Sequence, residues 1–112
     1  MRTIAGEMIR EKVLKNTHDE VPHAIAVEIN DFKDGPNGNV FIRATIYVER
    51  ESQKGIVIGA KGSLLKKIGQ EARRDIEGLT GTDVYLDLWV KVRADWRNKA
   101  KALKELGYRD EK

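Results

Sequence analysis

The residues with the clearest chemical potential lie in one stretch, IVIGAKGSLLKKIG, at positions 56–69. Gly59 and Gly62 bracket a lysine in this stretch, and a basic helical pattern begins directly after them. Glycines just before a helix let the backbone come close to another molecule, often to a phosphate group. That phosphate could belong to a nucleotide cofactor or to the backbone of a nucleic acid, or the stretch could simply be a turn.

The spacing of the glycines rules out the two common nucleotide-binding motifs. A P-loop requires G-x-x-x-x-G-K-[ST], with a lysine for the terminal phosphates and a hydroxyl for magnesium. Here the segment from Gly55 has the wrong spacing, and Gly62 stands where the hydroxyl is needed. A dinucleotide fingerprint requires G-x-G-x-x-G, and only its second half is present. We therefore expect no nucleotide cofactor.

No other group of residues forms a catalytic or metal-binding set. His18 and His23 flank a predicted turn, without cysteine partners or the helical spacing of metal ligands. Asp83 and Asp87 share a strand face, but no base, nucleophile or metal motif accompanies them. We predict that the chain is not an enzyme and that it has no catalytic residues, metal site, cofactor or small-molecule substrate.

The overall composition predicts one cytoplasmic domain. A chain of 112 residues can bury a core by itself, and the absence of cysteine excludes disulfides and fits a reducing compartment. No apolar run approaches the length of a membrane span, and the first residues lack the apolar segment of a signal peptide.

Positive charge is concentrated in two segments. The net charge is only +3, but residues 50–75 carry +4 and residues 91–104 carry +5, so the remainder is acidic. Localised basic segments favour a surface that binds a polyanion, although lysines can also simply solvate helix faces.

The apolar periodicity predicts the order helix, strand, strand, short helix, glycine loop, helix, strand, helix. These elements span about residues 3–17, 25–31, 40–48, 52–58, 59–62, 63–77, 84–92 and 97–106. The turn residues at 34–39 join the first two strands antiparallel, and the third strand follows a two-helix crossover, so it should lie parallel to the second. The fold class is α+β, a two-layer sandwich with a three-stranded mixed sheet and helices on one face.

The pattern [IV]-I-G-x-x-G, set between two helices after a β-hairpin, resembles the KH domain of RNA-binding proteins. In that family the glycines let the loop approach the backbone of about four nucleotides. Two lysines also follow near the start of the helix, where the macrodipole disfavours cations, which indicates a functional role. The predicted RNA-binding residues are Ile58, Gly59, Ala60, Lys61, Gly62, Ser63, Lys66 and Lys67.

The resemblance extends over most of the chain. The segments EVPHAIAVEI, ATIYVERESQKGIVIGAKGSLLKKIGQEAR, VYLDLWVKVRADWRN and KELGY resemble the carboxy-terminal domain of the Era GTPase family, from about Met8 to Tyr108. This likeness implies a type II KH fold of order α-β-β-α-α-β-α, with an interdomain helix at 1–20 and a KH core and carboxy-terminal helix at 24–108. It also implies binding of 16S-type ribosomal RNA, near its 3′ end, during assembly of the small ribosomal subunit.

Era-like proteins also carry an amino-terminal GTPase domain. The sequence contains neither a P-loop nor an Asn-Lys-x-Asp guanine motif. We therefore interpret the chain as an excised domain or a stand-alone relative, and we expect no GTP binding on it.

Two hypotheses of different class follow for the function. The first is a module that binds single-stranded RNA in a groove lined by the two central helices, the glycine loop and an adjacent strand. The alternative is a protein-interaction module that uses the same groove for a peptide or a partner domain. Binding that falls steeply with salt favours RNA. We expect the aromatic residues of the opposite sheet face to pack across strands or beneath a terminal helix rather than to stack on bases; they are Phe41, Tyr47, Tyr85 and Trp89.

Overall fold

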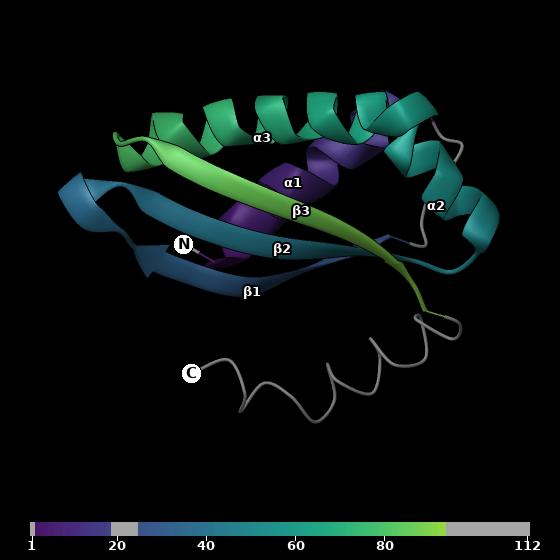
Figure 1. Ribbon diagram of the computed structural model, residues 1–112, viewed down its shortest axis with the longest axis horizontal. Helices are drawn as coiled ribbons and strands as arrows, with labels where there is room; N and C mark the ends of the chain where they lie inside the picture. The colour runs from purple at the N-terminus through teal and green to yellow at the C-terminus, as the bar shows by residue number, and fades with distance from the viewer. Residues whose placement is uncertain (1, 19–24, 94–112) are drawn as a thin grey trace.

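The computed structural model describes residues 2–18 and 25–93, which form a layer of helices on one face of a three-stranded sheet (Figure 1). The elements are α1 (Arg2–Thr17), β1 (Ala26–Asp34), β2 (Val40–Val48), α2 (Glu51–Ile58), α3 (Ser63–Thr80) and β3 (Val84–Val92), with single 3-10 turns at Pro36–Gly38 and Ala60–Gly62. The predicted helix over 97–106 lies outside the described residues, as does His23.

The topology of the sheet confirms the fold class predicted from the sequence. The strand order is β1-β2-β3, with β1 antiparallel and β3 parallel to β2. The hairpin turn between β1 and β2 places Asn37 at φ 63°, a left-handed conformation that asparagine tolerates better than most residues. The parallel partner β3 is reached through α2 and α3, so both helices are held against the same face of the sheet.

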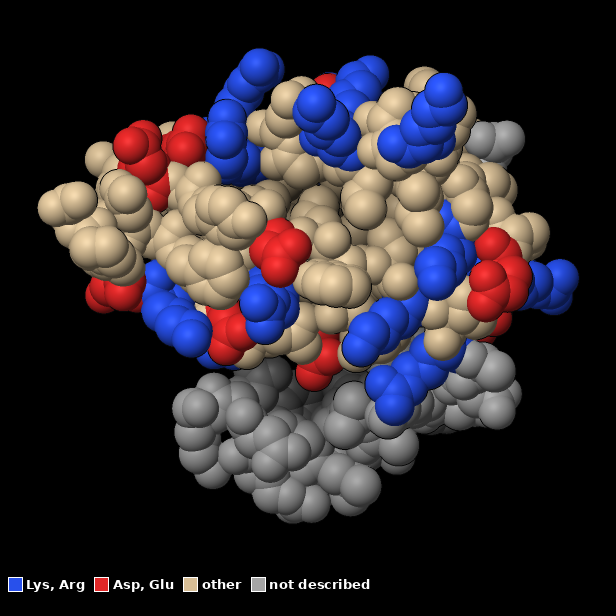
Figure 2. Space-filling view, in the orientation of Figure 1, with Lys and Arg blue, Asp and Glu red and all other residues tan. Residues whose placement is uncertain are grey.

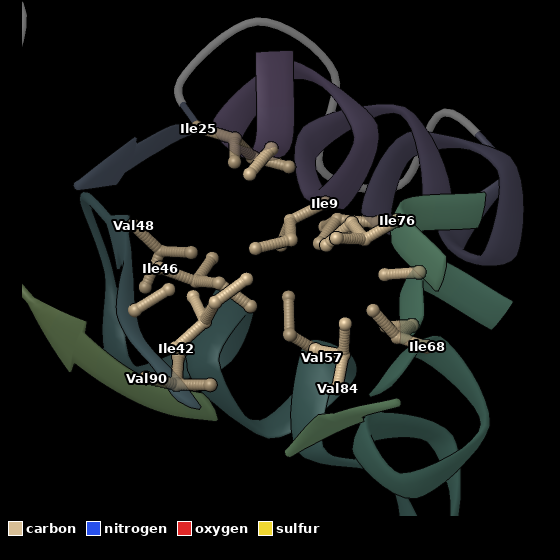
Figure 3. Packing of buried hydrophobic residues seen from close by; sticks show 14 of the residues in the cluster. Ile9, Ile25, Ile42, Ile46, Val48, Val57, Ile68, Ile76, Val84 and Val90 are labelled. Carbon is tan, nitrogen blue, oxygen red and sulfur yellow. The ribbon is translucent and has the colours of Figure 1, made fainter. Parts of the chain in front are cut away.

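The core lies between the sheet and the helices, as the alternation in β2 predicts. The inward-facing residues of β2 are all buried, and they pack with apolar residues of α1, α2 and α3 (Figure 3). In α3 the buried positions Ile68, Ala72 and Ile76 repeat at the spacing of one helix face. Leu79 continues that spacing in the last turn of α3, but its side chain is 51% exposed.

Two elements are longer than the sequence pattern predicts. A bulge between Ile29 and Asp31 inserts one extra residue into β1, so Phe32 returns to the inner face and the strand continues to Asp34. The simple alternation of apolar and polar residues therefore predicts an end of β1 that is too early in the chain. Helix α3 passes through Gly78 and ends only at Thr80; the next residue, Gly81, adopts the left-handed conformation at φ 71° and donates its N–H to the Glu77 carbonyl.

Polar contacts join α1 to α3. The Lys12 ammonium lies 2.9 Å from a carboxylate oxygen of Asp75, and the Asn16 side-chain amide donates to the Glu71 carboxylate at 2.9 Å. The hydrogen bond from Asn16 lowers the pKa of Glu71 below its usual value, and nearby lysines lower it further. These contacts fix α1 beside α3 as part of the same helical layer.

Candidate nucleic-acid interface

The loop between α2 and α3 has a backbone that only its glycines allow. Gly59 and Gly62 have φ angles of 75° and 79°, in the region that side chains strongly disfavour. A Cβ on Gly59 would lie 2.7 Å from the Cβ of Leu64 and 2.9 Å from its backbone nitrogen. The chain therefore turns back on itself tightly enough to require glycine at this position.

The tip of the loop is presented to solvent on a fixed base. Ala60 and Lys61 are exposed, and Lys61 itself adopts a left-handed φ of 56°. On the other side, Val57 is fully buried, and the Gln53 side chain accepts hydrogen bonds from the backbone N–H groups of Glu49 and Arg50 at the start of α2. A rigid helix thus carries an exposed, cationic loop.

The first turn of α3 is suited to an anion. The N–H of Ser63, its first residue, already donates to the Ala60 carbonyl, but the N-cap is Gly62, which has no side chain to accept a further N–H group, and the turn contains no acidic residue. Free N–H groups and the positive end of the helix dipole attract phosphate. Lys61 and Lys66 are exposed close by, and neither forms an ion pair with another residue in the described part of the chain.

A groove of about 440 Å³ begins at this loop and runs between α3 and β3. Leu65, Leu86 and Leu88 give it an apolar floor, while the outer side is polar. Its full lining is Gly62, Leu65, Lys66, Gly69, Gln70, Arg73, Tyr85, Leu86 and Leu88. An apolar floor with a cationic rim fits a flat ring attached to a phosphate chain.

The charge distribution on this face matches the groove. In Figure 2, Lys and Arg side chains project along the upper edge over α3, above a tan surface that is hollowed in its middle. A second group of Lys and Arg lies toward the carboxyl end of β3, where Lys91 and Arg93 are found. Asp and Glu side chains are also visible on this face, among and beside the basic groups (Figure 2).

The structure divides the residues predicted from sequence between the groove and its entrance. Gly62 and Lys66 line the groove, whereas the other predicted residues lie in or beside the glycine loop, and the lining contains no residue of α2. Ile58 ends α2 and is partly buried; Ser63 and Lys67 are exposed at the start of α3.

Sequence reasoning missed most of the groove wall. Gly69, Gln70 and Arg73 come from α3, and the spacing of 62, 66, 69 and 73 along one helix face is the signal that could have found them. The β3 contribution carries no comparable signal, because Leu86 and Leu88 look like ordinary core positions of a strand. Both are only partly buried.

The described residues contain neither a metal-binding group nor a membrane-spanning helix. Across residues 2–18 and 25–93, no three or more histidines and acids are grouped so that they could hold a metal ion. In the same ranges no helix is long and apolar enough to cross a membrane.

A helix–Gly-x-x-Gly–helix unit packed on a mixed sheet of order β1-β2-β3, with a groove beside the parallel strand, defines the type II KH fold. A family model described as the KH domain matches residues 20–97. The chain therefore belongs to the KH domain family.

Relatives place this domain within larger proteins. The chain is 55% identical over 111 residues to GTPase Era of Ruminiclostridium cellulolyticum, and 53% identical to GTPase Era of Heliobacterium modesticaldum. In both comparisons 99% of this chain is covered but only 37% of the relative, so the chain spans about a third of the length of these proteins.

Solved structures agree with the sequence relatives. A single-residue variant of Aquifex aeolicus Era, bound to GDP and AlF4−, superposes with a TM-score of 0.85 at 45% identity over 96% of this chain and 36% of its own. The same values hold for Era in complex with MgGDPNP and nucleotides 1506–1542 of 16S ribosomal RNA. The similarity is to the KH domain of these GTPases.

Proposed function

We propose that this domain binds single-stranded RNA, and that its target is small-subunit ribosomal RNA near the 3′ end, during ribosome assembly in the cytoplasm. The observation that carries the proposal is the joined geometry of the exposed glycine loop, the uncapped start of α3 and the groove. Phosphates would meet the loop amides together with Lys61, Lys66 and Lys67, while bases enter the groove. The bound 16S RNA in the related Era complex supports the choice of RNA.

The RNA target extends past the groove. A KH groove holds about four nucleotides, whereas the 16S segment in the Era complex spans nucleotides 1506–1542. We also propose that this chain neither binds nor hydrolyses GTP, because its glycine loop lacks the P-loop spacing and the relatives match it only through their KH domain.

The central experiment places carboxylates in the loop. Ala60→Asp combined with Lys61→Asp should abolish RNA binding, because two negative charges repel the phosphate that the glycines admit. Both side chains are exposed and aspartate tolerates the left-handed backbone, so the free energy of unfolding should change by less than about 1 kcal/mol.

The matched control puts two aspartates in the other exposed turn. Asn37→Asp with Asn39→Asp places one of them at a left-handed position, as Lys61→Asp does, and neither position belongs to the groove lining. This control should bind RNA as the wild type does. Normal binding by the Ala60/Lys61 variant with an unchanged thermal melt would refute the role of the loop.

Two further measurements separate RNA from the alternative protein partner. A single strand should bind at least about tenfold more tightly than a duplex of the same sequence, because a duplex hides the base edges that a KH groove reads. The affinity should also fall with salt. Binding that is insensitive to salt would favour a peptide or a partner domain in the groove.

A further inference from the structure

A second exposed surface begins where the groove ends. Tyr85 and Trp89 lie on the face of β3 that points away from the helices, and their side chains are 65% and 54% exposed. They are four residues apart on one strand, which separates them by about 13 Å. Tyr85 also lines the groove, so the two aromatic residues continue the groove around β3, one of the two edge strands of the described sheet.

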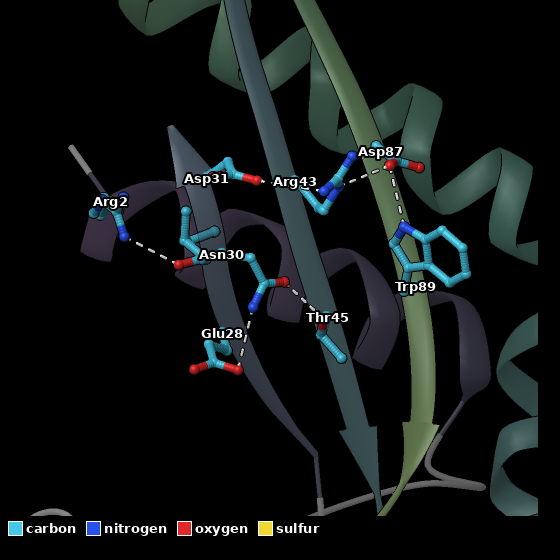
Figure 4. A network of polar contacts seen from close by, with 9 residues as sticks. Arg2, Glu28, Asn30, Asp31, Arg43, Thr45, Asp87 and Trp89 are labelled. Atoms are coloured by element: carbon cyan, nitrogen blue, oxygen red, sulfur yellow. Dashed lines mark hydrogen bonds and ion pairs between the residues drawn. The ribbon is translucent and has the colours of Figure 1, made fainter. Parts of the chain in front are cut away.

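Both rings are held in place by neighbours. The Tyr85 ring stacks on Phe41 with centroids 5.4 Å apart and planes inclined by 19°, which confirms cross-strand packing for this pair. The Trp89 indole nitrogen donates to the Asp87 carboxylate at 3.1 Å, and Figure 4 shows the indole extending past the edge of β3. Two exposed rings of fixed orientation lose little conformational entropy when another ring stacks on them.

The charges around these rings are of both signs. Arg43 lies between two carboxylates, with Nε 3.2 Å from Asp87 and Nη1 3.5 Å from Asp31, so it neutralises part of their negative charge (Figure 4). Beyond Trp89, Lys91 is exposed on the same face of β3 and carries no carboxylate partner in the described part of the chain. A phosphate passing the indole would meet this ammonium.

The sequence pattern favours packing of these rings over stacking on bases, but both are more than half exposed, and we propose that Tyr85 and Trp89 form a stacking surface for bases of the RNA strand after it leaves the groove and passes the edge of β3. The proposal rests on the RNA-binding function proposed above. Because that RNA is longer than a KH groove accommodates, nucleotides next to the groove-bound ones are available to contact the adjoining surface of the domain. Stacking on aromatic side chains accepts any base, so this surface would add affinity without adding sequence preference.

The test compares RNA lengths with one substitution. Trp89→Thr removes the ring and keeps a strand-forming residue. The binding of the variant is measured with an RNA of 16S nucleotides 1506–1542 and with a set of four-nucleotide RNAs that together cover this segment. The variant should bind the long RNA about tenfold more weakly, as expected for the loss of one stacked base, and should bind the tetranucleotides as the wild type does.

Two controls separate the ring from other effects. Trp89→Phe keeps an aromatic face but loses the hydrogen bond to Asp87, and it should retain most of the affinity for the long RNA. Leu79→Ala truncates another half-exposed apolar side chain, at the end of α3 and outside the groove lining, and should change nothing. Long RNA should also quench tryptophan fluorescence more than tetranucleotides do, and this additional quenching should disappear in Trp89→Phe.

The outcomes distinguish this inference from the function on which it rests. If the wild type binds RNA but Trp89→Thr binds the long RNA equally well, the stacking surface is refuted and the groove is not. The same holds if the loss is equal for both lengths, because the indole would then act on the groove itself. If the wild type binds neither RNA, the proposed function fails and the stacking surface fails with it.

Discussion

Gly69 offers a test in which stability and binding should change in opposite directions. It lies inside α3 and lines the groove, at a place where glycine costs about 1 kcal/mol relative to alanine. A Cβ there would meet only the Leu88 Cδ1 atom at 3.6 Å, an ordinary contact. Gly69→Ala should therefore stabilise the fold by about 1 kcal/mol, which corresponds to a rise in Tm of roughly 4 °C or more.

The same methyl group should weaken RNA binding, because it occupies part of the groove wall. An extra methyl group in a closely packed contact between the groove wall and a bound base costs about 1–3 kcal/mol, so the affinity for RNA should fall at least about fivefold. Gly78→Ala is the matched control: it lies on α3 with open space around it and outside the groove lining. It should stabilise the fold comparably and leave RNA binding unchanged.

Circular dichroism melts and anisotropy titrations with labelled single-stranded RNA measure the two effects. A Gly69→Ala domain that melts higher and binds RNA as tightly as the wild type would show that bases do not occupy this part of the groove. A domain that melts lower would refute the packing argument at Leu88.

Three further predictions follow from the loop and the helical layer. For a strand with three or four phosphates bound, the logarithm of the affinity should fall against log salt with a slope of about −2 to −3. Replacing both Lys66 and Lys67 with alanine should flatten this slope by roughly 1–2 units. An unchanged slope would mean that the phosphates are bound elsewhere on the domain. Gly59→Ala should destabilise the fold by about 2 kcal/mol or more, because it adds both a disfavoured φ and a steric overlap, and a wild-type urea midpoint would contradict that geometry. The pKa of Glu71, followed by NMR, should lie below its usual value and should rise in Asn16→Ala. Because folding favours the ionised Glu71 carboxylate, this carboxylate stabilises the fold at pH values above its ordinary pKa. The stabilisation is lost as the pH falls through the lowered pKa of the folded state.

The fold was predictable from the sequence because β2 and α3 carry clear apolar patterns. Strict alternation in β2 identified its buried face, and helical spacing did the same for α3. The failures have local causes. The bulge at Asn30 breaks the alternation of β1, and Gly78 suggests an end to α3 that the helix does not take.

The candidate site was only partly accessible. The glycine loop could be predicted from residue type, because its backbone conformation requires glycine at positions 59 and 62. The groove could not be predicted in this way, because it is formed by two elements that only the tertiary fold brings together. Leu86 and Arg73 are unremarkable in sequence, and their shared role depends on β3 lying along α3.

The parallel pairing of β2 with β3 has a consequence for the order of folding during synthesis. The β1–β2 hairpin needs only local contacts, so it can form as soon as it has emerged from the ribosome. The groove cannot, since one of its walls is β3, the last strand of the described sheet, and β3 pairs with β2 only after the whole α2–α3 crossover has been made. A nascent chain would therefore expose the cationic glycine loop before the groove exists, and selective RNA recognition would begin only after β3 has emerged from the ribosome and paired with β2.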